Sequence, residues 1–283
     1  MLAFVTGVGG PAGRATAAFL REHGVPVVVA DVRALEEEPA LVRLPLATEP
    51  GFLRALRAEL EARGAALLVP TVTEELPLVA RERDALRVSG CAVFISPSDA
   101  VETAHDKWLT VQALARVGVG VPRSLWGRSR AEVTEAIGFP LLSKPRLGRG
   151  GRGVEVHEGP ADLGETSLDR VYQEFLPGEE YDVNLFAKPG GEPAALVVLR
   201  KTALRDGRVG NAVEVERVSA PDVAELAGAT SRALGLEGPI DIDVRRNRIG
   251  RPLVLEVNAR VGANVRSADE VLEALLERWR ETS

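Results

Sequence analysis

The sequence predicts an α/β region followed by an α+β region, and three observations support this. Over about the first third of the chain, short apolar strands alternate with helical segments. Beyond Pro122, strands predominate and few helices intervene. The length of 283 residues suffices for two domains or three small ones. We therefore expect a domain with a parallel sheet at 1–96 and antiparallel sheets at 97–283.

The elements of the first region follow from its hydrophobic patterning. Phe52, Leu53, Leu56 and Leu60 recur at helical spacing and predict an amphipathic helix. Strands are expected at 1–7, 25–32, 65–71 and 91–96, and helices at 12–24, 52–64 and 75–90. This alternation predicts a parallel sheet with helices on its faces.

The second region begins with two helical segments within 96–118, the first capped by Ser98 or Asp99. Strands are expected near 139–144, 153–157, 171–175, 181–187, 194–201, 213–216, 239–245 and 252–258. Helices are expected at 221–236 and 268–281. Consecutive strands of this kind predict antiparallel sheets.

Composition and charge exclude several classes of protein. Hydrophobic residues make up 45% and charged residues 27%, as in globular proteins. The net charge of −6 argues against binding nucleic acid by bulk attraction. No apolar run approaches the ~20 residues of a membrane span, and glycine interrupts the start too early for a signal peptide. We expect a cytoplasmic protein whose single cysteine, Cys91, is a buried structural thiol.

Lysine is scarce, which makes each lysine informative. Of 35 basic residues only four are lysines, at positions 107, 144, 188 and 201. Because arginine does the routine solvation of the surface, we expect the lysines to mark special sites.

A first glycine-rich turn, TGVGGPAG, follows the first strand. Gly7, Gly9 and Ala12 fit a dinucleotide-binding pattern, and Asp31 ends the second strand where a ribose-binding acid would lie. This permits an NAD(P)-dependent oxidoreductase. Four strands are too few for a complete dinucleotide fold, however, and Pro11 removes an amide N–H near the pyrophosphate position. A tight strand-to-helix turn is the simpler interpretation.

A second glycine-rich loop lies in LLSKPRLGRGGRGV, residues 141–154. It is not a P-loop, because Lys144 precedes the glycines and a strand follows them. The loop, with Gly150 and Gly151 at its centre, joins two antiparallel strands and has exposed amides. Taken alone, it is either a lid over a triphosphate or a flexible hairpin.

The hairpin formed by IDIDV and PLVLEVNAR is the most informative segment. Strict alternation places Asp243, Glu256 and Asn258 on one face. These are the oxygen ligands that Mg²⁺ takes alongside nucleotide phosphates. Arg260 follows on the same face, within reach of a phosphoryl group. A solvated sheet face is the alternative, although clustered acids repel unless a cation lies between them.

These segments together resemble an ATP-grasp carboxylate ligase, nearest to the carbamoyl-phosphate-synthetase-like branch, over nearly the whole chain. The resemblance implies a pre-ATP-grasp domain at 1–96 and a two-subdomain ATP-grasp fold at 97–283. Its lid subdomain is expected at about 118–172 and its C-terminal subdomain at about 173–283. Ala259 departs from the family's usual E-x-N-P-R motif, and Asp243 stands where relatives often carry glutamine.

The resemblance also implies a role for individual residues. Lys107 in DKWLT, Lys144 and the lid glycines Gly150 and Gly151 would hold the ATP phosphates. Glu174, Phe175 and Leu176 would border adenine, and Glu180 would hold the ribose. Asp243, Glu256 and Asn258 would bind metal, Arg260 would bind the phosphoryl group, and Arg200 and Lys201 would assist catalysis.

The implied activity is an ATP-dependent ligase with two Mg²⁺ ions, for which Mn²⁺ could substitute. A carboxylate becomes an acylphosphate, and an amine then forms an amide or peptide bond, with release of ADP and phosphate. The partners are small-molecule carboxylates and amines, with no nucleic acid or membrane, and a homodimer is compatible. A non-catalytic nucleotide-binding regulator is a further alternative. His23, His105 and His157 form no triad, and we expect His105 on the surface.

Overall fold

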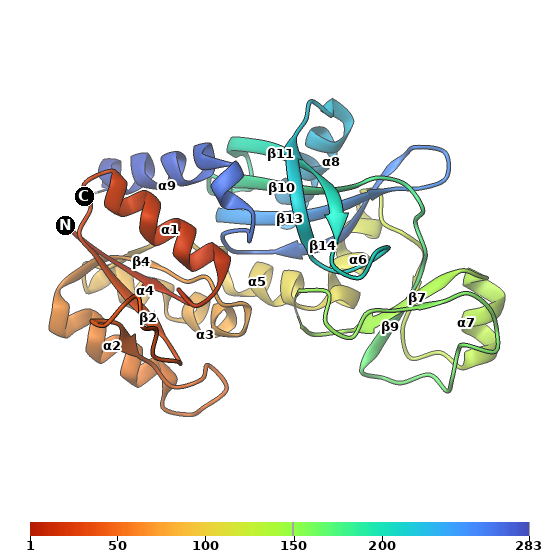
Figure 1. Ribbon diagram of the computed structural model, residues 1–283, viewed down its shortest axis with the longest axis horizontal. Helices are drawn as coiled ribbons and strands as arrows, with labels where there is room; N and C mark the ends of the chain where they lie inside the picture. Colours follow the sequence, from red (N-terminus) through yellow and green to blue (C-terminus); the bar gives the residue numbers. More distant parts are fainter. Residues whose placement is uncertain (149, 283) are drawn as a thin grey trace.

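The computed structural model describes residues 1–148 and 150–282 (Figure 1). Its N-terminal part is a five-stranded parallel sheet in the order β3-β2-β1-β4-β5. The strands are β1 (Leu2–Thr6), β2 (Val27–Asp31), β3 (Val42–Arg43), β4 (Ala65–Val69) and β5 (Ala92–Val93). The predicted parallel sheet is therefore present, with the short strand β3 as an unforeseen addition at its edge.

Helices cover both faces of this sheet. They are α1 (Pro11–Glu22), α2 (Phe52–Arg63), α3 (Leu76–Arg81) and α4 (Arg83–Val88), with a 3₁₀ turn at Thr73–Glu75. The single helix expected at 75–90 was wrong, because the chain tightens at Glu82, whose amide donates to the carbonyl of Val79 at 3.1 Å. Cys91 is buried, as expected, and its burial raises the pKa of the thiol to about 11.

The second sheet is antiparallel, in the order β12-β11-β10-β13-β14. Its strands are β10 (Glu180–Ala187), β11 (Pro193–Leu204), β12 (Ala212–Arg217), β13 (Gly238–Arg246) and β14 (Pro252–Asn258). Helix α8 (Pro221–Ala233) covers the apolar face that carries Val183 and Ile242. On the opposite face, α9 (Asp269–Thr282) covers the part around Phe186 and Leu199. The rest of this face, which α9 does not cover, is polar.

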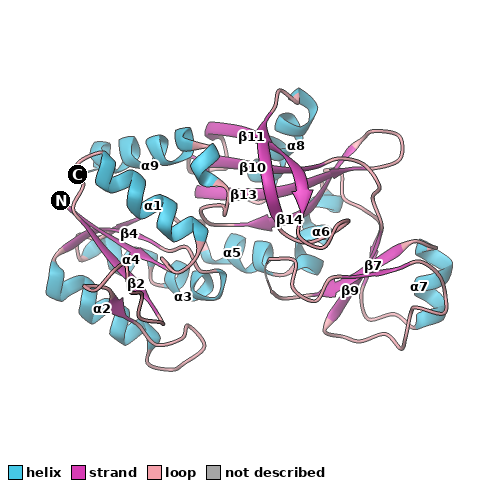
Figure 2. Cartoon of the chain, viewed as in Figure 1, coloured by secondary structure: helices cyan, strands magenta, loops and turns pink. Residues whose placement is uncertain are grey.

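A third, four-stranded sheet lies at the far end of the molecule from the termini (Figures 1 and 2). Its order is β6-β9-β7-β8, and every pairing is antiparallel. It consists of β6 (Ser124–Leu125), β7 (Leu141–Pro145), β8 (Glu155–His157) and β9 (Arg170–Glu174), with helix α7 (Arg130–Ile137) beside it. The sequence analysis missed β6 and α7. Val133, Leu141 and Tyr172 belong to a small separate core.

Two helices link these parts, α5 (Ser98–His105) and α6 (Lys107–Arg116), as the two predicted helical segments. Figure 1 shows α5 running between the first and second sheets. The helices are separated at Asp106, whose side chain accepts hydrogen bonds from the amides of Trp108 and Leu109 and so caps α6. Lys107 is thereby held at the first position of α6.

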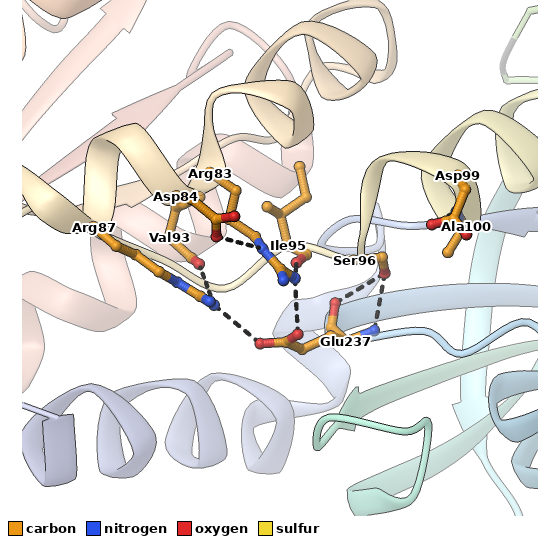
Figure 3. A network of polar contacts seen from close by, with 9 residues as sticks. All are labelled: Arg83, Asp84, Arg87, Val93, Ile95, Ser96, Asp99, Ala100 and Glu237. Atoms are coloured by element: carbon orange, nitrogen blue, oxygen red, sulfur yellow. Dashed lines mark hydrogen bonds and ion pairs between the residues drawn. The ribbon is translucent and has the colours of Figure 1, made fainter.

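Three sets of contacts fix the N-terminal sheet against the second sheet. Glu237, just before β13, forms ion pairs with Arg83 and Arg87 of α4 at 2.9 and 3.1 Å (Figure 3). Ser96 Oγ donates to the carbonyl of Glu237 at 3.0 Å and accepts from its amide at 2.9 Å. Helix α9 packs on both sheets, and Trp279 Nε1 donates to the carbonyl of Ala66 at 3.2 Å.

Among the described residues, no helix is long and apolar enough to cross a membrane.

Candidate active site

Three of the four lysines of the chain lie in one polar area between the second sheet, the third sheet and α6. Lys201 of β11 lies between two carboxylates. Its Nζ lies 2.7 Å from Glu180 Oε1 and 2.5 Å from Asp243 Oδ1. Burial alone would lower the pKa of Lys201, but Asp243, Glu180 and Asp182 outweigh burial and raise this pKa well above its usual value. Lys201 is therefore a permanent cation between two carboxylates.

The predicted hairpin of β13 and β14 brings the proposed metal ligands together. Asp243 pairs directly with Glu256, and Asp241 pairs with Asn258. Glu256 Oε1 lies 3.2 Å from Nζ of Lys107. Because side chains alternate along each strand, the four strand residues Asp241, Asp243, Glu256 and Asn258 project from one face of the sheet.

Lys107 joins this hairpin to the glycine-rich loop. Its Nζ donates to the carbonyl of Gly148 at 2.8 Å. Arg146, at the root of the loop, donates from Nε to Asp106 Oδ2 at 2.7 Å, and the Lys107 amide donates to the Arg146 carbonyl at 3.1 Å. The start of α6 and the root of the loop are thus one hydrogen-bonded unit.

Lys144 of β7 is 5% exposed and contacts the same hairpin from the third sheet. Its Nζ donates to Gln173 Oε1 at 3.1 Å and to the carbonyl of Leu255 at 2.9 Å. Burial lowers the pKa of Lys144 to about 8, against the opposing effect of Glu256. A phosphate that entered this area would restore the full charge of the ammonium group.

The donor set of the hairpin fits a divalent metal that is also held by phosphate. No three His, Cys, Asp or Glu side chains form a ready-made metal site in residues 1–148 and 150–282. Asp243, Glu256 and Asn258 offer two carboxylates and an amide oxygen, and Mg²⁺ commonly takes one or two carboxylates plus substrate phosphates. The ammonium groups of Lys201 and Lys107 already lie on these carboxylates, so the oxygens are arranged around positive charge.

The segment expected to border adenine follows β9. Phe175 and Leu176 are buried. Glu174 is turned away, because its carboxylate accepts from the amide of Arg123 at 2.9 Å and from Arg123 Nε at 3.2 Å. The Glu174 amide also donates to the carbonyl of Arg123, at 2.9 Å. The guanidinium of Arg208 lies 4.2 Å from the ring centroid of Phe175.

The glycine-rich loop lies against the loop that joins β11 to β12. Gly150 and Gly151 have φ of +69° and +66°, a region that disfavours side chains. A Cβ on Gly151 would lie 2.7 Å from the Cα of Gly210, so the two backbones approach too closely for a side chain. Arg149, within this loop, lies outside the described residues.

Arg260 lies at the boundary with the N-terminal domain. Its Nε donates to Thr73 Oγ1 at 3.0 Å, and its Nη1 donates to the carbonyl of Val261 at 2.7 Å. The same Nη1 lies 3.8 Å from Asp241 Oδ2. The side chain is thus held beside the hairpin by Thr73, which follows β4 of the N-terminal sheet, and by groups of the second sheet and the segment after it.

The structure does not bring Arg200 into this area, so its geometry gives no support to the expected catalytic role. Arg200 Nη1 lies 2.7 Å from Glu179 Oε1, and a second contact joins Arg200 to Glu216. Successive side chains of a strand point to opposite faces, so Arg200 and Lys201 cannot both face Glu180.

Sequence reasoning missed a buried polar cluster of Asp182, Asn184, Asp241 and Asn264. Asp182 accepts from Asn184 Nδ2 at 2.6 Å and from Asn264 Nδ2 at 2.5 Å. Burial raises the pKa of both Asp182 and Asp241, and neighbouring carboxylates raise it further. The alternation of EYDVNLF, which puts Glu180, Asp182 and Asn184 on one face, was the available signal.

His105 is also closer to the site than expected. Its Nδ1 is buried and has no hydrogen-bond partner among the described residues. It lines a cavity of about 10 Å³ together with Thr73, Gly148, Glu256 and Asn258. Burial, followed by the charge of Lys107, lowers the pKa of His105.

The first glycine turn does not favour a dinucleotide. Asp31 Oδ2, expected at a ribose, accepts from the amide of Gly9 at 2.8 Å. A Cβ on Gly7 would lie 2.5 Å from a methyl group of Val72. The carboxylate of Asp31 and the loop after β4 therefore occupy the space around this turn. The alternative of an NAD(P)-dependent oxidoreductase is left without support.

Comparison with known families agrees with this geometry. Residues 104–264, more than half of the chain, match the model of the ATP-grasp domain. The chain belongs to the ATP-grasp family. The matched range contains Lys107, Lys144, Lys201 and the β13–β14 hairpin. The family match therefore confirms the resemblance that the sequence motifs indicated.

Two curated relatives show how far similarity extends. The chain is 27% identical over 277 residues to the uncharacterized protein y4rH of Sinorhizobium fredii, covering 87% of this chain and 54% of that protein. It is 29% identical over 189 residues to a probable α-L-glutamate ligase of Xanthomonas oryzae, covering 59% of this chain and 60% of the relative. The chain thus spans only about half to three fifths of these relatives.

Solved structures share the fold of this ATP-grasp chain. An L-amino acid ligase from Bacillus licheniformis has a TM-score of 0.70 at 18% identity, covering 94% of this chain and 68% of that one. A biotin carboxylase from Campylobacter jejuni has a TM-score of 0.73 at 15% identity, covering 97% and 70% respectively. The mixed parallel and antiparallel architecture is therefore that of ATP-grasp enzymes.

Proposed function

We propose that this ATP-grasp chain is an ATP-dependent ligase that phosphorylates a carboxylate and couples the acylphosphate to an amine. The observation that carries the proposal is the convergence of Lys107, Lys144 and Lys201 on the hairpin of Asp243 and Glu256. Three scarce lysines beside two paired acids suit a polyphosphate and its metal better than they suit a structural core.

The nucleotide would lie between the second and third sheets. Lys107, Lys144 and the loop around Gly150 and Gly151 would hold the phosphates, and Glu180 would hold the ribose. Asp243, Glu256 and Asn258 would hold Mg²⁺, with two ions or Mn²⁺ as finer expectations. A bound metal would neutralise charge on the transferred phosphoryl group.

The chemistry of the chain's own residues would be positioning and charge stabilisation. The carboxylate oxygen attacks the γ-phosphorus, and the bond to the bridging oxygen of ADP breaks. Arg260 would contact the phosphoryl oxygens through its planar guanidinium, and Lys201 would hold Asp243 and Glu180 in place. The amine nitrogen then attacks the acyl carbon, phosphate leaves, and the amine loses a proton.

The substrates would be small molecules. The names of the relatives, an α-L-glutamate ligase and an L-amino acid ligase, support an amino acid as carboxylate or amine. The polar cluster around Asp182 lies next to Arg260 and Asn258, where the substrates would meet the phosphoryl group. Membership of the carbamoyl-phosphate-synthetase-like branch and a homodimeric state stay predictions.

Two measurements test the proposal. Thermal melting with ATP and Mg²⁺ should raise the melting temperature, whereas NADH should not. A screen of carboxylates and amines for ADP release should then identify the substrates, with hydroxylamine to trap the acylphosphate. A large shift with NADH and none with ATP and Mg²⁺ would exclude the ligase.

A further inference from the structure

We infer that Arg245 of β13 is a positioning residue that orients the ribose-binding carboxylate and unites the parts of the nucleotide pocket. The inference rests on the proposed function, because it assigns Glu180 to a bound nucleotide. Neither the sequence motifs nor the family resemblance singled out Arg245. It follows Asp243 by two residues, so it projects from the same face of the sheet.

Arg245 is the direct cross-strand partner of Glu180. The two residues lie opposite each other in the pairing of β10 with β13, and Arg245 Nη1 lies 3.1 Å from Glu180 Oε2. The other oxygen, Oε1, lies 2.7 Å from Nζ of Lys201. The carboxylate is thus held by one cation on each oxygen, which fixes its plane.

This arrangement leaves the carboxylate able to accept further hydrogen bonds. An ionised carboxylate has about four lone-pair sites, and the contacts with Arg245 and Lys201 use two of them. Among the described residues no other group donates to this carboxylate, so the remaining sites would accept from the hydroxyl groups of a ribose. A carboxylate clamped from two sides presents these acceptors in one orientation, whereas an unclamped glutamate would rotate. Orientation of this kind is what recognition of a ribose diol requires.

Arg245 also ties two loops to this carboxylate. Its Nε donates to the carbonyl of Gly178 at 3.1 Å, in the segment that follows Phe175. Its Nη1 donates to the carbonyl of Arg208 at 2.8 Å, in the loop between β11 and β12. Its guanidinium carbon lies 5.1 Å from the ring centroid of Phe175.

The same β11–β12 loop meets the glycine-rich loop through Gly210 and Gly151. Arg245 therefore connects the adenine-bordering segment, the ribose carboxylate and the loop that touches the lid. Burial of its side chain, which is 10% exposed, makes these contacts persistent. Lysine cannot replace them together, because a single ammonium group lacks the planar fork of a guanidinium.

The test uses Arg245→Lys, which keeps the charge and removes the fork. Isothermal titration in Mg²⁺ would measure affinity for ATP, 2′-deoxy-ATP and 3′-deoxy-ATP. Wild type should prefer ATP over at least one deoxy analogue. In the variant, ATP affinity should fall about tenfold, as expected from the loss of a charged hydrogen bond. The ratio of the affinity for ATP to the affinity for that analogue should become smaller. A merely structural role would weaken all three nucleotides equally.

The matched control is Arg246→Lys in the next position of the same strand. Arg246 forms two contacts with Asp222, at 2.6 and 2.9 Å, and donates to the Tyr181 hydroxyl at 3.0 Å. It has an equally dense network on the opposite face, so its variant should keep the nucleotide preference. Unchanged ATP affinity and preference in a folded Arg245→Lys overturns the inference. A wild type that binds no ATP contradicts the proposed function itself.

Hydrogen exchange on the wild type decides the matter if Arg245→Lys does not fold. An ATP analogue should protect the amides of 175–180 and of 205–211 to a similar extent, because Arg245 joins both segments to one carboxylate. Protection of 175–180 alone would overturn the inference.

Discussion

Arg260 Nε donates a hydrogen bond to Thr73 Oγ1 across 3.0 Å, although the residues are 187 positions apart in the chain. The contact joins the end of the β14 hairpin to the loop that follows β4 of the N-terminal sheet. The preceding residue, Val72, donates its amide to the carboxylate of Glu75 at 2.9 Å, and this carboxylate also accepts from the hydroxyl of Thr6. The N-terminal domain thus sets the direction of the arginine proposed to bind the phosphoryl group.

Thr73→Val should lower turnover by roughly tenfold to a hundredfold and leave ATP affinity nearly unchanged. Valine matches the shape of threonine but cannot accept from Arg260, and a hydrogen bond to a charged group is worth about 1.5–3 kcal/mol. Steady-state measurement of ADP release, once a substrate pair is known, gives kcat and the KM for ATP separately. Thr103→Val, whose hydroxyl bonds only within helix α5, is the control. Equal turnover in both variants would contradict the role assigned to Thr73.

ATP affinity should depend on the charge of Lys144. The pKa of this buried ammonium is about 8 without ligand, so the protein must take up a proton to bind phosphate at higher pH. Affinity should therefore be level below pH 8 and fall by up to about tenfold per unit above it. Titration calorimetry from pH 7 to 9.5 measures the slope. In Lys144→Arg the charge persists, and the slope should disappear; the same slope in both proteins would refute this explanation.

Glu75 should make the folded state less stable as pH rises from about 5 to 7. Burial raises the pKa of Glu75 to about 7 against its usual 4.5, so the folded state binds more protons in this range than the unfolded state. Stability is then present below pH 4.5 and lost as pH passes 7, by about 3 kcal/mol. Urea unfolding at several pH values measures it. Glu75→Gln should abolish most of this loss, whereas Glu74→Gln, which removes only the smallest contribution to the raised pKa, should keep most of it.

Glu237→Gln should destabilise the junction between the first and second sheets. Glu237 binds Arg83 and Arg87 in a half-buried position (Figure 3), and removing one partner of enclosed ion pairs is costly. We expect a loss of about 1–3 kcal/mol in urea unfolding. Glu192→Gln, which loses an exposed pair with Arg232, should change stability by less than about 1 kcal/mol. Similar effects in both variants would show that this junction is not special.

The strands and the hairpin face could be predicted from the sequence because a two-residue alternation directly encodes which side chains share a face. Asp243, Glu256 and Asn258 were found in this way, and the structure has Asp243 opposite Glu256. The same rule shows that Arg200 and Lys201 cannot share a face, but it does not show which of the two faces the site. That decision needed the register of β11 against β10, which the sequence does not state.

Contacts between distant segments could not be read from local patterns. Thr73 lies just after β4 of the N-terminal sheet, and its contact with Arg260 depends on the packing of this sheet against the second one through α9 and Glu237. Arg245 carried no motif, because its role depends on Gly178 and Arg208 in two other loops. His105 follows the same logic, since its burial arises where α5 meets β14.

The central claim is that the acids of the β13–β14 hairpin hold the metal of an ATP-dependent reaction. Its most direct test is Mg²⁺-dependent ADP release by wild type and by the double variant Asp243→Asn, Glu256→Gln. Both substitutions keep side-chain size and remove a charge, and loss of such electrostatic stabilisation should lower the rate by at least ~10²–10³-fold. A folded double variant with wild-type Mg²⁺-dependent ADP release would contradict the account.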